Sequence, residues 1–221
     1  MTTYIATQAS AMTRVYRNMA LSVFNSMVVA YIVSQSPPLT EFFLTGAMKW
    51  VVLVFPLALI FAVYTILQNN ESPIVAHGLL HIFATIMGIS LSAVFIHYSV
   101  SLITSALMSA TVLFTTMAIY GMTTKRDLTS LGGFLIVGLI ALIVVSVINL
   151  FIGNSGLDLV LSGIGVIIFL GFTAYNAQNI QEIVRYGSNT NLEVMGALSL
   201  YLDFVNLFLD LLRIFGALSD D

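Results

Sequence analysis

The chain contains no cysteine and very few charged residues. Of its 221 residues, only 8% are charged, whereas 59% are hydrophobic. The lack of cysteine excludes disulfides, thiolate metal sites and cysteine nucleophiles. A soluble domain of ordinary composition has about 25% charged residues, because water must solvate its surface. This chain cannot cover its outside in that way, so it is predicted to be an integral membrane protein surrounded by lipid.

Several functional classes are excluded by features that the sequence lacks. Its seven Lys and Arg residues are scattered singly or in pairs, so it has no basic stripe that would bind nucleic acid. There is no Gly-x-Ser-x-Gly nucleophile elbow and no phosphate-binding glycine loop. No lysine lies deep in an apolar run, which excludes a retinal Schiff base. We therefore expect neither an enzyme nor a resident cofactor or metal.

Long apolar runs dominate the sequence. A spanning helix needs roughly 20 apolar residues to cross a hydrocarbon core of about 30 Å. Seven runs meet this requirement, so the fold class is predicted to be an all-α integral membrane protein with seven transmembrane helices. In chain order the runs are Asn18–Ser34, Leu44–Leu67, Pro73–His97, Ser99–Met122, Ser130–Ile152, Leu157–Ile180 and Gly196–Leu218.

The remaining segments are short. Residues 1–17 carry Arg14 and Arg17 but no apolar core, so they are predicted to be a cytoplasmic segment rather than a cleavable signal peptide. Residues 18–218 form one membrane domain, and residues 219–221 form an acidic tail. The longest connection, from Gln181 to about Met195, is too small to be a domain.

The basic residues predict the orientation of the chain. Lys and Arg in short loops gather on the cytoplasmic side. With a cytoplasmic N-terminus, five of them lie inside and two outside, which favours this arrangement and places the C-terminus outside. The inner five are Arg14, Arg17, Lys125, Arg126 and Arg185, and the outer two are Lys49 and Arg213.

The last apolar run contains a stripe of polar residues. At 100° per residue, Asp203, Asn206 and Asp210 fall within an arc of roughly 60° on one helix face. A carboxylate at the middle of a membrane costs about 2.5–3.5 kcal/mol, so Asp203 is expected to face the bundle interior. It is either part of an ion or proton pathway or a protonated group that joins two helices. Arg213, three residues after Asp210, has an ordinary ion-pair spacing.

The sixth run provides a matching polar face. Thr173, Asn176 and Asn179 recur at three-residue steps and therefore share one side of the helix. The end of this run and the start of the seventh lie towards the same membrane face. Asn176 and Asp203 are thus expected to meet at a similar depth.

The third run carries two histidines four residues apart, His77 and His81. This spacing allows both to ligate zinc, but a third protein ligand is missing because His97 lies about 24 Å further along the helix. Imidazole titrates near physiological pH, so the pair can instead sense pH at the cytoplasmic side. A third interpretation is that both are interfacial packing residues.

Three segments together resemble the bacterial branch of the Bax inhibitor-1 family, the transmembrane Bax inhibitor motif proteins. They are Tyr120–Gly133 (YGMTTKRDLTSLGG), Gly171–Ile180 (GFTAYNAQNI) and Gly196–Gly216 (GALSLYLDFVNLFLDLLRIFG). The resemblance covers the chain from the first apolar run onward and is most specific in the last 100 residues. It implies a seven-helix bundle wrapped around a central helix seven, and a pH-sensitive calcium leak through the membrane.

The resemblance also implies roles for particular residues. The family uses an aspartate pair on helices six and seven as a latch and pH sensor, with calcium bound only transiently. The helix-seven aspartate matches Asp203, but the helix-six position is Asn176, so only one member of this pair can ionise. The family latch also uses a basic residue on helix two, where this chain has only Lys49 at the outer edge.

A second role implied by the resemblance belongs to another class. Some bacterial relatives modulate a membrane-anchored AAA protease, which requires a cytoplasmic N-terminal segment and a lipid-embedded surface rather than a pore. The expected partners are thus the lipid bilayer and, under this alternative, such a protease. The expected location is the bacterial cytoplasmic (inner) membrane, and the sequence indicates no particular oligomeric state.

Overall fold

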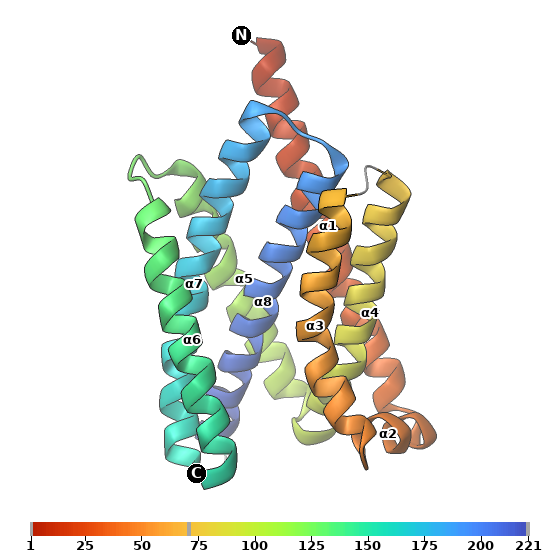
Figure 1. Cartoon of the computed structure of the whole chain (residues 1–221). Coiled ribbons are helices and arrows are strands. Elements are labelled where there is room, and N and C mark those ends of the chain that lie inside the picture. Colours follow the sequence, from red (N-terminus) through yellow and green to blue (C-terminus); the bar gives the residue numbers. More distant parts are fainter. Residues whose placement is uncertain (1, 70–71, 220–221) are drawn as a thin grey trace. The chain divides into compact units, whose positions relative to one another are not determined.

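The structure is a computed structural model that describes residues 2–69 and 72–219 (Figure 1). Within these residues the chain forms eight α-helices and no strand, which confirms the all-α prediction. The helices are α1 (Thr2–Ser34), α2 (Pro37–Leu44), α3 (Met48–Asn69), α4 (Pro73–His97), α5 (Val100–Thr123), α6 (Thr129–Ile152), α7 (Ser155–Tyr186) and α8 (Thr190–Ser219). The predicted tail residues Asp220 and Asp221, and Asn70 and Glu71 of the α3–α4 connection, lie outside the described residues.

The length and composition of the helices agree with a membrane protein of six or seven spans. Among the described residues, α3 to α8 are each long and apolar enough to cross a bilayer, and α1 joins them if it is counted together with α2. The helices α4, α5 and α6 begin and end within a residue of the predicted runs. Hydropathy therefore located these spans correctly.

The helices belong to two compact units. The first comprises the chain up to Ser99 together with Ile183–Tyr201, and the second comprises Val100–Glu182 together with the chain from Leu202 onward. Helix α8 contributes residues to both units. It is also the most buried span, with 67% of its most apolar window inside the protein against 11% for α6.

In the first unit, α1 is longer than the sequence indicated. The predicted run began at Asn18, but the helix already starts at Thr2. Ala11 and Val15 are completely buried, so part of the predicted N-terminal segment is packed in the core. The reason for the difference is that residues 2–17 include polar side chains such as Arg14 and Arg17, which lower the hydropathy of this part of the helix.

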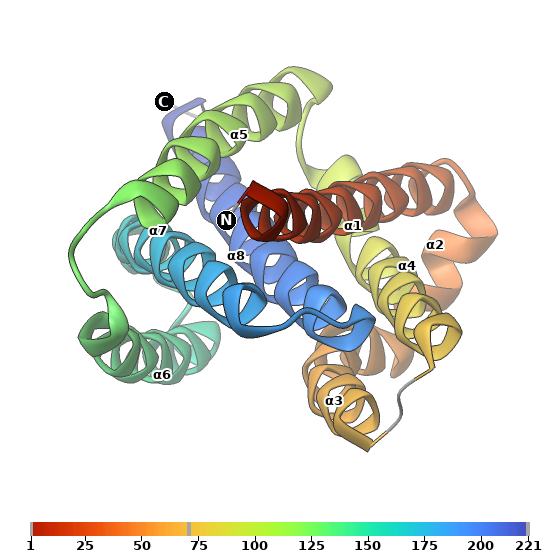
Figure 2. The same cartoon turned by 90° about the horizontal axis from the view of Figure 1, so that it is seen from above.

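The connection between the first two predicted runs also differs from the expectation. Residues Pro37–Leu44 form the separate short helix α2, and the following span starts at Met48 rather than Leu44. Pro37 and Pro38 occupy the first positions of α2. Proline is tolerated there because the first N–H groups of a helix have no acceptor within the helix. The chain turns by 106° between α1 and α2, and Figure 2 shows α2 running across the end of the first unit.

In the second unit, α7 packs closely against two helices. A Cβ atom at Gly121 of α5 would collide with the backbone of Ala174, and one at Gly132 of α6 would lie 2.7 Å from the ring of Tyr175. Glycine at both positions therefore allows α5 and α6 to approach α7. Helix α7 continues past the predicted end at Ile180 to Tyr186, and α8 starts at Thr190 instead of Gly196, which shortens the predicted connection.

Candidate functional site

The centre of the candidate site is a hydrogen bond between α7 and α8. The side-chain amide Nδ2 of Asn176 donates to Oδ2 of Asp203 over 2.7 Å. Asp203 is only 5% exposed, and Asn176 is half-buried. The predicted meeting of these two residues is confirmed, and the carboxyl group of Asp203 has the interior position that its cost in lipid requires.

The neighbours of these two residues fix their positions. Asn176 follows Ala174 and Tyr175, the two residues of α7 that pack against Gly121 and Gly132. Next to Asp203, the ring of Phe204 contacts Phe114 of α5 edge to face, with 5.6 Å between the ring centroids. Both helices are therefore held against α5 within one turn of the hydrogen bond.

The polar stripe on α8 continues away from this bond. Asn206 is half-buried, and its Nδ2 donates to the carbonyl oxygen of Leu202 over 2.8 Å. Asp210 is 6% exposed, and its Oδ1 accepts from Nη1 of Arg213 over 3.0 Å, which confirms the predicted ion-pair spacing. Its other oxygen, Oδ2, is buried and has no hydrogen-bond partner among the described residues.

This unpartnered oxygen of Asp210 lies against α7. A Cβ atom at Gly165 would collide with it, so only glycine leaves room for the carboxyl group at that position. Asp203 and Asp210 are seven residues apart, which corresponds to about 10 Å along the helix axis. Two buried acidic groups and one amide thus lie along a single face of α8, within the second unit.

Asn179, the third polar residue of the α7 face, does not join the site. Its side chain is exposed, whereas the neighbouring Gln178 holds the loop between α5 and α6. Oε1 of Gln178 accepts from the backbone N–H of Leu128 over 2.8 Å, and Nε2 donates to the carbonyl oxygen of Arg126 over 2.9 Å. In that loop, hydrogen bonds from Thr129 hold the pKa of the exposed Asp127 below its ordinary value.

The two histidines lie in the first unit, on α4. His77 is half-buried and His81 is exposed. Nδ2 of Asn25 donates to the carbonyl oxygen of His81 and to Oγ1 of Thr85, each over 3.1 Å. His81 and Asn25 line a shallow pocket of about 340 Å³. The part of the chain that the structure describes contains no group of three or more His, Asp or Glu side chains that could hold a metal ion.

One charged pair was missed by the sequence analysis. Arg14 of α1 donates from Nε and Nη2 to the two carboxylate oxygens of Glu193 on α8, over 2.8 and 2.6 Å. Ser188 also donates to Glu193 over 2.5 Å. Glu193 is 5% exposed, so this fork fixes the start of α8 to α1 inside the first unit. No pattern in the sequence predicts that these two distant residues meet. The only signal is that an acidic side chain beside an apolar run needs a basic partner once it is buried.

The start of α8 is fixed at a second point. The hydroxyl oxygens of Ser26 on α1 and Tyr201 lie 2.6 Å apart, and Ser26 also donates to the carbonyl oxygen of Ala84 on α4. Tyr201 is completely buried. Its ring contacts Phe83 edge to face. The segment of α8 that precedes Asp203 is therefore held rigidly by α1 and α4.

The chemistry available at the stripe is that of oxygen ligands and an exchangeable proton. Carboxylate oxygens and neighbouring amide oxygens are the ligands that hard cations such as Ca²⁺ prefer. A carboxyl group in the interior of a membrane protein is also typical of proton and ion pathways. The fold and this stripe together define a polytopic, all-helical membrane protein with ionisable groups inside its spans.

Comparison with known proteins then identifies the family. The family described as "Inhibitor of apoptosis-promoting Bax1" matches residues 8–220. The chain belongs to this family, the Bax inhibitor-1 family, which confirms the resemblance seen in the sequence.

Three relatives illustrate the match. The Escherichia coli K12 inner membrane protein YbhL is 34% identical over 212 residues, covering 93% of this chain and 90% of YbhL. An uncharacterized protein of Borreliella burgdorferi is 33% identical over 214 residues, covering 94% and 92%. An uncharacterized membrane protein of Streptococcus pyogenes serotype M3 is 40% identical over 138 residues, covering 61% of this chain and 60% of that protein.

Proposed function

We propose that the protein is a cation leak pathway of the bacterial inner membrane whose conductance depends on pH. The observation that supports this proposal is the buried carboxyl group of Asp203, which is bonded to Asn176 and aligned with Asn206 and Asp210 on α8. A helix that only filled space in a bundle would have little reason to bury two acids, since each costs several kcal/mol in lipid. The relative YbhL supports the inner-membrane location by its name.

Calcium is the cation that best suits this stripe. Ca²⁺ binds to carboxylate and amide oxygens in flexible arrangements, and it competes with protons for the same carboxylate. Calcium entry should therefore rise with pH as Asp203 loses its proton. The test is calcium flux into liposomes that contain the purified protein, measured with a trapped indicator over a range of pH. Flux equal to that of empty liposomes at every pH would contradict a leak function.

The second part of the proposal is the orientation, with the N-terminus in the cytoplasm and the C-terminus outside. Reporter fusions should show an external Asp221 and a cytoplasmic Arg126, because most Lys and Arg residues in the connections lie on the inner side under this arrangement. An alkaline phosphatase and a green fluorescent protein fused at each position report the two sides independently. If both positions were on the same side of the membrane, the number of spans between them would be even, which would contradict the three spans α6, α7 and α8.

A second candidate function is the modulation of a membrane-anchored AAA protease. Figure 1 favours it in one respect, because the first turns of α1 project beyond the neighbouring ends of α3 and α4. A helix end of this kind can bind a partner without a change in the membrane domain. The polar composition of residues 2–13 predicts that the bundle does not require them, but Ala11 and Met12 are buried, so this prediction is wrong for these two residues.

The test of this second function removes only residues 2–9. If the projecting end recruits a protease, this deletion should abolish an effect of the protein on membrane-protein turnover, while the amount of folded protein stays unchanged. The measurement is a pulse-chase of membrane proteins in cells with the parent, the deletion variant or no protein. The deletion variant should leave calcium flux in liposomes unaltered, which separates the two candidate functions. Turnover that does not respond to the protein at all would remove the second one.

A further inference from the structure

Helix α2 has an unusual exposure for a segment between two membrane spans. None of its eight residues is buried, and Leu39 and Phe42 are 38% and 58% exposed. It is joined to α1 by a hydrogen bond in which Oγ1 of Thr40 donates to the carbonyl oxygen of Val33 over 3.0 Å. An exposed helix with large apolar side chains requires an apolar environment on one side.

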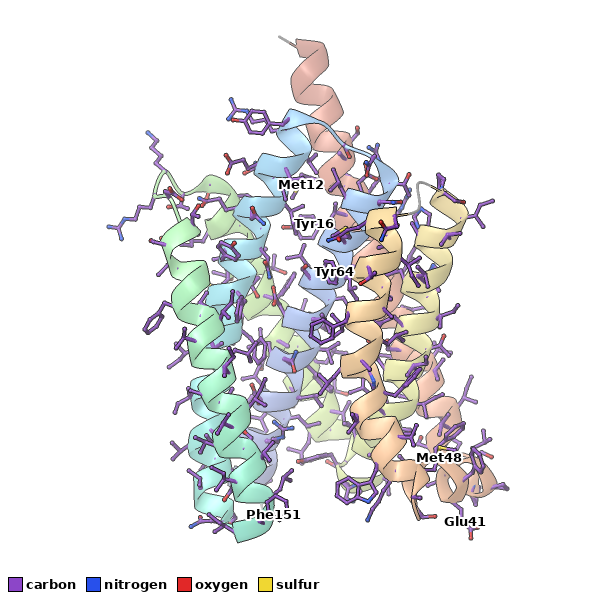
Figure 3. The ribbon with its side chains drawn as sticks, viewed as in Figure 1. Met12, Tyr16, Glu41, Met48, Tyr64 and Phe151 are labelled. Carbon is purple, nitrogen blue, oxygen red and sulfur yellow. The ribbon has the colours of Figure 1, made fainter. Side chains whose placement is uncertain are left out.

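The side chains of α2 divide into two faces. At 100° per residue, Leu39, Phe42 and Phe43 fall within an arc of about 100°, and Glu41 points almost directly away from its centre. Figure 3 shows Glu41 pointing away from the helices, at the opposite end of the first unit from Met12. Apart from Leu44, the helix therefore has its large apolar side chains on one face, and Glu41 is directed outward from the end of the unit.

The geometry argues against a helix that crosses the membrane or dips into it. The eight residues of α2 span about 12 Å, and the α1 segment Ser10–Ser34 is already about 37 Å long, enough for the hydrocarbon core alone. The turn that follows α2 has Gly46 at φ 57°, and its irregular backbone needs water or polar groups, which lipid-exposed segments lack inside the bilayer. This turn therefore lies outside the hydrocarbon.

We propose that α2 lies flat on the membrane, with Leu39, Phe42 and Phe43 inserted at the boundary between the lipid headgroups and the acyl chains. The 106° bend after α1 sets its axis almost perpendicular to that span. The surface is continuous with the lipid-facing side of α3, where Trp50 is 58% exposed and lies under Nζ of Lys49 at 5.3 Å. Tryptophan and lysine prefer this same boundary region.

The chain contains a single tryptophan, which allows a direct test. The protein is placed in phosphatidylcholine vesicles whose acyl chains are brominated either close to the headgroup or close to the methyl end. Bromine quenches tryptophan fluorescence only at short range. In the parent, Trp50 should be quenched more strongly by the bromines near the headgroup. Moving the reporter onto α2, as Phe42→Trp in a Trp50→Phe background, should give the same preference.

A matched variant provides the deep reference. Phe61→Trp in the same background places the reporter on the exposed side of α3, 11 residues or about 16 Å further from the start of that helix than Trp50. It should be quenched more strongly by the bromines near the methyl end. Deep quenching of the Phe42→Trp reporter would show a re-entrant helix and overturn the proposal. An absence of quenching by either lipid would also overturn it, because α2 would then face water, a partner protein or a second copy of the chain.

Discussion

Replacing Asp203 with asparagine is expected to reduce calcium flux into liposomes by about tenfold or more and to remove most of its dependence on pH. The substitution keeps the size of the side chain and leaves an oxygen that can accept from Asn176, so the 2.7 Å contact can persist. It removes the charge that would bind the cation. A tenfold loss corresponds to roughly 1.4 kcal/mol, which is within the range for a hydrogen bond or ligand contact to a charged group.

The control for this experiment is Asp127→Asn, which removes an equal charge from an exposed loop. Asn can still accept the bond that Asp127 Oδ1 receives from the backbone N–H of Thr129, so the loop should keep its structure. Flux through this variant should equal that of the parent. Asp203→Ala should lose flux as Asp203→Asn does, and should also be less stable because Asn176 loses its acceptor. Unaltered flux in both Asp203 variants, at equal protein content, would assign Asp203 to helix packing.

The spans could be predicted well where a helix faces lipid. In α5 and α6 only 28% and 11% of the most apolar window is buried inside the protein, and the hydropathy of the chain located the ends of both helices almost to the residue. The start of α1 could not be found in this way, because residues 2–17 carry polar side chains such as Arg14, which is paired with Glu193. Hydropathy measures what a segment would cost in lipid, and it fails where polar residues are bonded inside the protein.

The candidate site could be predicted because it depends on helix periodicity. Asp203, Asn206 and Asp210 share a face for geometric reasons alone, and the direction of the chain places Asn176 at the depth of Asp203. The pair of Arg14 and Glu193 could not be found, since no local rule connects α1 to the start of α8. The orphaned oxygen of Asp210 also depends on the space left by Gly165, which only the packing of α7 against α8 reveals.

Replacing Asn176 with aspartate is expected to change the pH dependence of flux from a single titration to a coupled one. In the parent, the amide of Asn176 cannot ionise, so only Asp203 contributes a proton at this position. In the variant, two carboxyl groups would lie within hydrogen-bond distance in a medium of low dielectric constant, and they would share a proton. Their interaction should exceed about one pK unit, or roughly 1.4 kcal/mol, which a curve of flux against pH can resolve.

The direction of the change follows from the competition between protons and calcium. When both carboxylates are ionised, the pair offers two charges to calcium, so binding at high pH should be tighter than in the parent. As the pH falls, the pair takes up a proton and loses charge, so calcium flux should decrease more steeply with pH in the variant than in the parent. Flux measured from acidic to alkaline pH at several calcium concentrations separates these two effects. Asn176→Gln keeps the amide and adds one methylene group, so it shows what a change of side chain at this position does without a new charge.

The two histidines of α4 offer a competing source of pH dependence. Both carry an imidazole that can exchange a proton, and His81 is exposed in the first unit. Replacing His77 and His81 together with glutamine removes this source. If Asn176→Asp and the parent then still show the same pH profile, the bond between α7 and α8 is not the switch. If the profiles differ as expected, the amide at position 176 is what makes the natural protein respond to a single proton.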